Sequence, residues 1–308
     1  MADFTSGFWD FYIGIITLVS IAACAVLLNS LSSKRVSTDA KSTTGHLWDE
    51  DLGEYNNPLP RWWIWLFYIT IVFSLAYLWY YPGLGSYAGS GKWTSVGEYR
   101  DEVAQAETEY GPLFRKFAAM DIKQAAADPA ARVAGQKLFL TYCAQCHSSD
   151  GGGSRGFPNL TDNDWLYGGE PETIKTSILN GRNGVMPPFG PVLGDGGAKD
   201  VAHYVRSLSG LTADDIRIVR GKPAYVQNCA ACHGADGKGN QQLGAPNLTD
   251  KTWLYASSEA TIIETITKGR NNAMPAQKDF LGEDRVHILA AYVYGLSHPE
   301  LGKAAAGK

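Results

Sequence analysis

The stretch YCAQCH at 142–147 returns 86 positions later as NCAACH at 228–233, and this repetition decides the organisation of the chain. Two longer segments repeat with a displacement of 88: PNLTDNDWLYG (158–168) as PNLTDKTWLYA (246–256), and NGRNGVMP (180–187) as KGRNNAMP (268–275). A fixed displacement of this kind indicates consecutive copies of one structural unit. The sequence therefore predicts two tandem domains of the same fold, 126–211 and 212–308.

Each repeat contains three segments with helical signals. The first begins at Asp128 and Pro129, because Asp can cap a helix and Pro suits its first turn. The others are a middle helix at 170–180 and 259–268, followed by Gly in both copies, and a last helix at 200–208 and 284–296. No alternating pattern is long enough for a sheet, so the sequence predicts an all-α fold.

Both repeated stretches contain Cys-x-x-Cys-His: Cys143, Cys146 and His147, then Cys229, Cys232 and His233. Cysteines three apart lie on one face of a helical turn, where their sulfurs can bind the two vinyl groups of one haem. The adjoining His can then bind the iron. A thioredoxin-like dithiol would need a βαβ pattern, and one zinc site shared by both pairs would leave the two His without a role. Both remain weaker alternatives.

The repeat also identifies candidates for the second axial position of each iron. Met186 and Met274 match each other and are each followed by Pro, whereas His203, His287 and His298 have no counterpart in the other copy. Ligation by His and Met favours a higher reduction potential than ligation by two His. Two firm axial ligands leave no open position for a substrate, which favours an electron carrier over an enzyme.

Three repeat-matched pairs of residues could support the cofactor: Arg182 with Arg270, Trp165 with Trp253, and Pro158 with Pro246. The arginines, four residues before each Met, could meet haem propionates or be solvated loop side chains. The tryptophans could pack on the haem or reach a propionate. The proline carbonyls could orient the proximal His, as the outer partners of metal ligands do.

Two uncharged apolar segments, 11–31 and 62–81, are long enough to cross a bilayer. The first lacks the basic start of a signal peptide, so we expect a retained anchor, with Cys24 as a small buried apolar residue in it. The loop at 34–61 carries the basic residues Lys34, Arg35, Lys41 and Arg61. The positive-inside rule places this loop in the cytoplasm and both termini, with the repeats, outside.

These boundaries divide the chain into an N-terminal tail with the first transmembrane helix (1–33), a cytoplasmic loop (34–61), a second transmembrane helix (62–82), a linker with some helix (83–125) and the two repeats. The formal net charge of −4 and the pI of about 5.9 argue against a nucleic-acid partner.

Cys-x-x-Cys-His with a later Met-Pro resembles class I cytochrome c domains, and that resemblance implies their helical, haem-enclosing fold. The whole chain, including GHLWDEDLGEYNNPLPRWWIWLFYITIVF (45–73), is similar to the dihaem subunit, CcoP or FixP, of cbb3-type cytochrome c oxidases. The resemblance implies two haems c, ligated by His147 with Met186 and by His233 with Met274. The first span is where the match is loosest, because many relatives have one span.

The resemblance also implies a role at the bacterial inner membrane, with the haem domains in the periplasm. Such a subunit accepts electrons from soluble cytochrome c and passes them to a monohaem cytochrome c subunit. They then reach the haem–copper subunit that reduces oxygen in a proton-pumping respiratory complex, so the chain itself has no oxygen-reducing site. A free-standing membrane-anchored dihaem cytochrome and a dihaem peroxidase are the alternatives.

Overall fold

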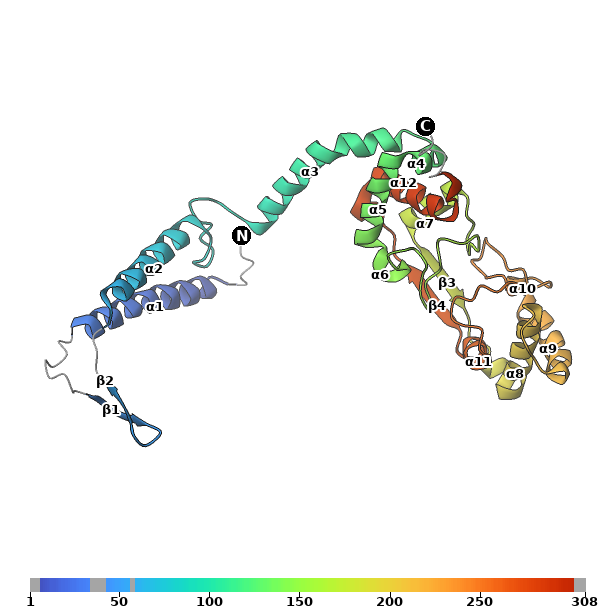
Figure 1. Cartoon of the computed structure of the whole chain (residues 1–308), viewed down its shortest axis with the longest axis horizontal. Coiled ribbons are helices and arrows are strands. Elements are labelled where there is room, and N and C mark those ends of the chain that lie inside the picture. Colours follow the sequence, from blue (N-terminus) through green and yellow to red (C-terminus); the bar gives the residue numbers. More distant parts are fainter. Residues whose placement is uncertain (1–5, 34–42, 56–58, 302–308) are drawn as a thin grey trace. The chain divides into compact units, whose positions relative to one another are not determined.

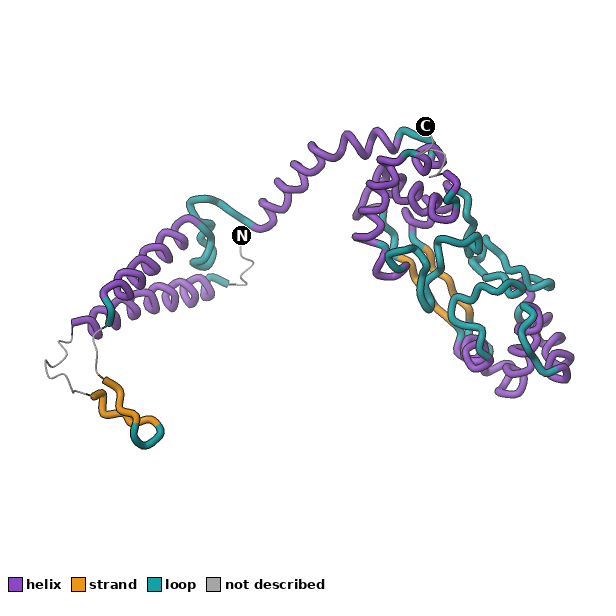
Figure 2. Tube along the Cα trace, in the orientation of Figure 1, coloured by secondary structure: helices purple, strands orange, loops and turns teal. Residues whose placement is uncertain are grey.

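The computed structural model describes residues 6–33, 43–55 and 59–301. Its contacts divide the chain into two compact units, Met1–Thr108 and Glu109–Lys308. The described residues form mostly helices, as Figures 1 and 2 show, which confirms the predicted helical class. They also form two short two-stranded sheets, so the expectation of no sheet was wrong.

The first unit contains the two predicted membrane helices, α1 (Phe8–Ser33) and α2 (Arg61–Tyr80). Both are long and apolar enough to cross a membrane, and almost none of their surface is buried within the protein. Cys24 is accordingly exposed on α1, where we expected a buried side chain. Between the helices lies the exposed hairpin of β1 (Thr43–Trp48) and β2 (Leu52–Tyr55).

One carboxylate ties the start of α1 to the chain that follows α2. Asp10 accepts hydrogen bonds from the backbone N–H and the hydroxyl of Ser86, both at 2.8 Å. The start of α1 and the end of α2 therefore lie at the same end of this helix pair. That arrangement is what a hairpin of two membrane spans requires.

The linker contains α3 (Ser95–Ala118), which continues from the first unit into the second. The second unit follows the helical signals of the repeat. Its elements are α4 (Ile122–Ala127), α5 (Pro129–Tyr142), α6 (Ala144–His147), α7 (Pro171–Asn180), β3 (Arg182–Met186), α8 (Gly190–Leu208), α9 (Asp215–Asn228), α10 (Ala230–His233), α11 (Glu259–Lys268), β4 (Arg270–Met274) and α12 (Lys278–Ser297).

Local sequence explains where several of these helices begin and bend. The side chain of Asp128 accepts hydrogen bonds from the backbone N–H groups of Ala130 and Ala131, which caps α5 as predicted. The last helix of each repeat is longer than predicted and is kinked at a glycine with positive φ, Gly194 in α8 and Gly282 in α12. A glycine can adopt that backbone conformation without strain.

The two repeats exchange their last helices. The first core packs α5 and α7 of the first repeat against α12 of the second, with Ile174, Ile178, Ile288 and Leu289 among its buried residues. The second core packs α9 and α11 of the second repeat against α8 of the first. Figure 1 shows α12 beside α5 and α7, and α8 beside α9 and α11.

The chain crosses between the two cores along a ribbon formed by β3 and β4, which lie side by side in Figures 1 and 2. The strands pair antiparallel, with Arg182 opposite Met274 and Met186 opposite Arg270. At the centre Gly184 lies opposite Asn272, its own equivalent in the other repeat. The pairing is therefore self-complementary, as at a two-fold interface between identical subunits.

Backbone hydrogen bonds repeat this symmetry on both sides of the ribbon. The N–H of Phe189, before α8, donates to the carbonyl of Ile266 in α11 at 2.9 Å. The N–H of Gln277, before α12, donates to the carbonyl of Ile178 in α7 at 3.0 Å. The predicted boundaries 126–211 and 212–308 therefore mark copies in the sequence, whereas each packed core combines residues from both copies.

Candidate functional site

Each Cys-x-x-Cys-His motif forms a single helical turn directly after a longer helix. In the first motif, the backbone N–H groups of Cys146 and His147 donate to the carbonyl of Cys143 at 3.1 and 3.0 Å. The second motif, which ends at His233, has the same geometry around the carbonyl of Cys229. The four thiols are free, and one cysteine of each pair is exposed while the other is at least half-buried.

The two histidines are buried and held by a proline carbonyl. Nδ1 of His147 lies 3.0 Å from the carbonyl oxygen of Pro158, and Nδ1 of His233 lies 3.1 Å from that of Pro246. A carbonyl only accepts, so Nδ1 carries the proton and Nε2 is left with its lone pair. Burial lowers the pKa of both rings, although the hydrogen bond opposes this, which favours the neutral, ligating form.

The half-buried and buried thiols are weak acids in this environment. Burial, with a smaller contribution from Cys146, raises the pKa of Cys143 to about 11. Burial and the neighbouring Cys232 raise the pKa of Cys229 to about 11 as well. Both thiols are therefore protonated near neutral pH in the haem-free chain, and neither resembles the low-pKa thiolate of a dithiol redox site.

The methionines follow the exchanged helices. Met274, from the second repeat, packs against the first core together with Cys143 and Trp165. Met186, from the first repeat, packs against the second core. The structure thus brings each predicted methionine into the core of the Cys-x-x-Cys-His motif of the other repeat, whereas the resemblance had implied pairing within a repeat.

The second core repeats the arrangement with its own tryptophan. Trp253 packs against this core, which includes the buried Cys229. Trp165 and Trp253 therefore pack in the core that contains the Cys pair of their own repeat, whereas Met186 and Met274 pack in the core of the other repeat. The two cysteine pairs lie in different cores. Among the described residues no group of three His, Cys, Asp or Glu side chains converges as a metal site.

The arginines lie on aromatic rings rather than in open loops. The guanidinium carbon of Arg182 lies 4.6 Å from the ring centre of Tyr167, and that of Arg270 lies 4.2 Å from the ring centre of Tyr255. Nε of Arg182 also donates to the hydroxyl of Ser177 at 2.9 Å. Each guanidinium is thereby held at the inner, less exposed face of the ribbon.

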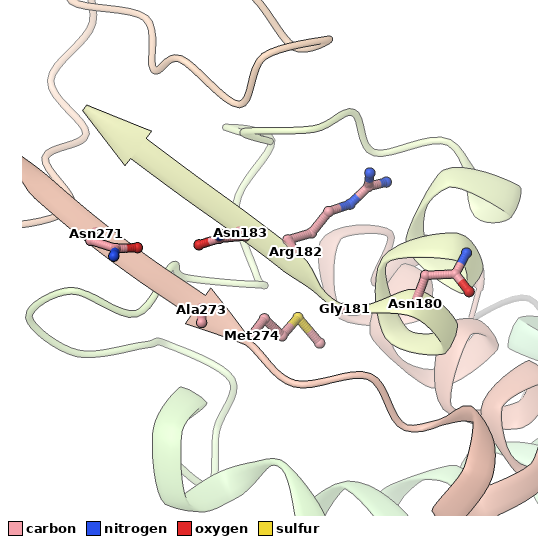
Figure 3. A pocket seen from close by; sticks show the side chains of 7 residues that line it. All are labelled: Asn180, Gly181, Arg182, Asn183, Asn271, Ala273 and Met274. Carbon is pink, nitrogen blue, oxygen red and sulfur yellow. The ribbon is translucent and has the colours of Figure 1, made fainter. Parts of the chain in front are cut away.

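A shallow hollow of about 450 Å³, largely open to solvent, lies beside the ribbon. Its lining includes Arg182 and Met274, which come from different repeats, together with Asn183 and Asn271. Figure 3 shows the Met274 side chain beside Gly181, at the point where β3 begins. Arg182 and Met274, one from each repeat, therefore lie side by side at this hollow.

The residues of each centre fit a covalently attached haem. Two free thiols lie one helical turn apart, an imidazole is oriented with Nε2 available, and a thioether packs into the same core. Tyr167 and Tyr255, which lie two residues after each tryptophan, were not singled out from the sequence. Their signal was present in the matched WLY of 165–167 and 253–255.

Comparison with known proteins gives matches over nearly the whole chain. Residues 40–88 match the family model described as the N-terminal domain of cytochrome oxidase-cbb3, FixP. Residues 130–205 and 217–293 each match the model described as cytochrome c oxidase, cbb3-type, subunit III. The second model thus matches twice, in agreement with the repeat in the sequence.

Curated relatives agree with the family models. The chain is 47% identical to the cbb3-type cytochrome c oxidase subunit CcoP of Rubrivivax gelatinosus over 96% of its length and 97% of the relative. It is 42% identical to subunit FixP of Bradyrhizobium diazoefficiens over 84% of its length and 96% of the relative. It is 39% identical to subunit CcoP of Cereibacter sphaeroides, over 84% and 95%.

The matched models, the curated relatives and the two membrane-length helices together show the role of the chain. The domains are cytochrome c domains, they imply haem c, and the N-terminal helices fit a membrane anchor. The chain therefore belongs to the CcoP and FixP family of cbb3-type cytochrome c oxidase subunits, and it is an electron-transfer subunit of that oxidoreductase complex.

Proposed function

We propose that the chain carries two haems c and relays electrons from a soluble cytochrome c toward the haem–copper subunit of the oxidase. Cys143 and Cys146 bind the first haem, and Cys229 and Cys232 bind the second. When bound, each haem supplies an iron that takes up and releases one electron at a time.

The axial ligands in this proposal cross between the repeats. His147 and Met274 hold the iron of the first haem, and His233 and Met186 hold that of the second. The support is the core in which each side chain lies, because Met274 packs with Cys143, whereas Met186 packs with the core of Cys229. This exchange of methionines between the cores is the single observation that carries the proposed ligand sets.

The other side chains of the site orient the cofactor and exclude water. The carbonyls of Pro158 and Pro246 fix the tautomers of His147 and His233, so that Nε2 keeps the lone pair that an iron would bind. We assign the binding of the haem propionates to Arg182 in the first centre and to Arg270 in the second. Trp165 and Trp253 lie in the cores of their own motifs, where they would cover the cofactor.

Two filled axial positions suit electron relay, because the iron then exchanges electrons without binding a substrate. Ligation by His and Met also favours a higher reduction potential. The ribbon of β3 and β4 runs from one core to the other, and carries Met274 and Met186 at opposite ends of the register. Both methionines would therefore be carried by one ribbon of two hydrogen-bonded strands.

The partners in this proposal are the catalytic haem–copper subunit, the monohaem cytochrome c subunit, the soluble donor and the membrane lipid. The loop 34–61 lies in the cytoplasm of the bacterium, while both termini and the haem domains lie in the periplasm at the inner membrane. The hydrogen bonds between Asp10 and Ser86 support the placement of the start of α1 and the end of α2 on one side of the membrane, and the basic loop assigns that side to the periplasm.

Purification of the native membrane complex tests the proposal. We expect this chain to copurify in fixed proportion with a haem–copper subunit, and its intact mass to show two added haems. Isolation of the dihaem chain without oxidase subunits would favour the free-standing cytochrome. Rapid peroxide turnover by the unmodified chain alone would contradict the carrier function, because that reaction needs an iron with a free or releasable position.

A further inference from the structure

The hairpin of β1 and β2 exposes every residue of its two strands (Figure 1). Four of these residues are large and apolar, with 59% to 67% of their surface exposed: Leu47, Trp48, Leu52 and Tyr55. A two-stranded hairpin without a packing partner is marginally stable in water. Apolar surface gathered on such a hairpin therefore indicates an interaction with another molecule.

The register of the hairpin divides these side chains between two faces. Trp48 lies opposite Leu52, and the ring of His46 stacks on that of Trp48 with 6.4 Å between the ring centres. Leu47 and Tyr55 lie on the opposite face, because side chains alternate along a strand. His46, Trp48 and Leu52 thus form one continuous surface, the Trp48 face.

Carboxylates border the Trp48 face. The turn consists of Asp49, Glu50 and Asp51, Glu54 follows in β2, and residues 43–55 contain no Lys or Arg. Glu50 has φ +71°, a backbone conformation that Gly or Asn adopts with less strain. Strain at an exposed residue of this kind favours a functional role for its side chain.

We propose that the Trp48 face and these carboxylates bind a cytoplasmic loop of another membrane subunit of the oxidase, one that carries Lys or Arg beside an apolar side chain. The apolar side chain packs on Trp48 and Leu52, and the cation pairs with Glu50 or a neighbouring carboxylate. The inference rests on the topology in the proposed function, which places residues 34–61 in the cytoplasm.

Charge identifies this occupant. Cytoplasmic loops of membrane proteins carry an excess of Lys and Arg, so an acidic surface on that side of the membrane complements the loops of neighbouring subunits. The cytoplasmic leaflet is itself negative, so its headgroups repel the carboxylates of the hairpin. A second copy of the hairpin carries the same negative charge and is repelled as well. A basic loop therefore matches both the apolar face and the charge around it.

Chain length keeps the hairpin near the membrane surface, where such loops emerge. Tyr55 and Arg61, the first residue of α2, are six residues apart, which allows at most about 21 Å between them. Trp62, Trp63 and Trp65 follow at the start of α2, and tryptophans are typical of the membrane interface. The hairpin is therefore within reach of loops that leave the membrane beside α2.

The test uses the full chain in the purified membrane complex. Benzoylphenylalanine, a photo-crosslinking residue, replaces Leu52 on the Trp48 face or Tyr55 on the opposite face, and mass spectrometry identifies the crosslinked peptide. We expect Leu52→benzoylphenylalanine to crosslink to a cytoplasmic loop of another oxidase subunit that contains Lys or Arg. The matched variant Tyr55→benzoylphenylalanine should give little of that product.

Charge variants separate the two parts of the contact. In the chain with Leu52→benzoylphenylalanine, Glu50→Gln with Asp51→Asn keeps the apolar face and should reduce the crosslink. Raising the salt from about 0.01 M to about 1 M, which shortens the Debye length from about 30 Å to about 3 Å, should reduce it too. Trp48→Ala should reduce the yield through the lost apolar contact. Asp101→Asn, at an exposed acid of α3, is the matched control and should leave the yield unchanged.

The outcomes separate this inference from the proposed function. Copurification with the haem–copper subunit and an intact mass with two haems report the proposed function in every variant. If both hold and the crosslink goes only to lipid, to a second copy of this chain or to nothing, the inference is wrong and the carrier function stands. The same holds if the crosslink is unchanged by the charge variants. If the unmodified chain copurifies with no oxidase subunit, the proposed function fails and the inference with it.

Discussion

Replacing Met186 by Ala should remove the sulfur ligand from the haem on Cys229 and Cys232, although Met186 belongs to the other repeat. The reason is the exchange in the fold, because Met186 packs against the core that contains Cys229. In the same way, Met274→Ala should affect the haem on Cys143, the motif with which Met274 shares a core.

The register of the ribbon shows that one methionine cannot replace the other as a ligand. Met274 lies opposite Arg182, and Met186 lies four residues further along β3. At about 3.4 Å per residue, the two methionines are about 14 Å apart along the strands, so neither thioether can replace the other. We therefore expect complete loss of one sulfur ligand and a fall in that potential on the order of 0.1 V, a fraction of the roughly 0.8 V that axial ligands span.

The assay needs chains with one haem each. One background replaces Cys143 and Cys146 by Ala and keeps the second haem, and the other replaces Cys229 and Cys232 and keeps the first. Met186→Ala and Met274→Ala are introduced into both backgrounds. The ligand-field absorption of the Met–iron bond and the reduction potential are then recorded for all four combinations.

Crossed ligation predicts that Met186→Ala affects the remaining haem where Cys229 and Cys232 are intact, and has little effect in the other background. The complementary pattern holds for Met274→Ala. Ligation within each repeat predicts the opposite result in all four combinations. A loss of sulfur ligation by Met186→Ala in the chain that keeps Cys143 would refute the crossed ligand sets.

Three further predictions follow from the same structure. Gly181 has φ +70° and a Cβ there would overlap the carbonyl oxygen of Met274, so Gly181→Ala should lower the free energy of unfolding by about 3 kcal/mol, measured by denaturant titration. Burial lowers the pKa of His287 from 6.5, and its Nε2 donates to the carbonyl of Met120. The stabilisation by neutral, buried His287 is therefore complete above pH 6.5 and is lost as the pH falls through the folded-state pKa. Replacing His287 by Gln should make the decline in Tm below pH 6.5 less steep. A plot of Tm against pH that is the same in the variant would contradict this. The isolated fragment 126–211 should exchange helices with a second copy, so sedimentation should show a concentration-dependent dimer, and a stable monomer at all concentrations would contradict the shared cores.

The sequence predicted the local parts of the site and not their assembly. Helix signals around the Cys-x-x-Cys-His motifs depend on neighbouring residues, and the structure has those helices. The exchange of helices depends on whether α8 or α12 packs in the first core. Val201 and Val205 in α8 occupy the same repeat positions as Leu289 and Val293 in α12, and all four are buried. Because α8 and α12 have the same pattern of apolar residues, the sequence pattern does not predict which helix packs in which core.

The ribbon was missed for a related reason. Each strand has five residues, and Arg182–Met186 contains too little alternation to predict a strand by itself. Its partner is its own equivalent in the other repeat, so no hairpin turn marks the pairing. The ligand residues and the predicted domain boundaries stay predictions, because the ligand assignments need the haem-loaded chain to test them.

The exchanged helices also determine when, during synthesis of the chain, the first core can be completed. The polypeptide is made from its N-terminus, so Cys143 is synthesised long before the α12 residues that complete its core. The first core is closed only when α12, as far as Tyr294, has followed. Cys143 therefore gains its packing partners from α12 only after the second repeat has been made, whereas Cys146 stays exposed even in the complete fold.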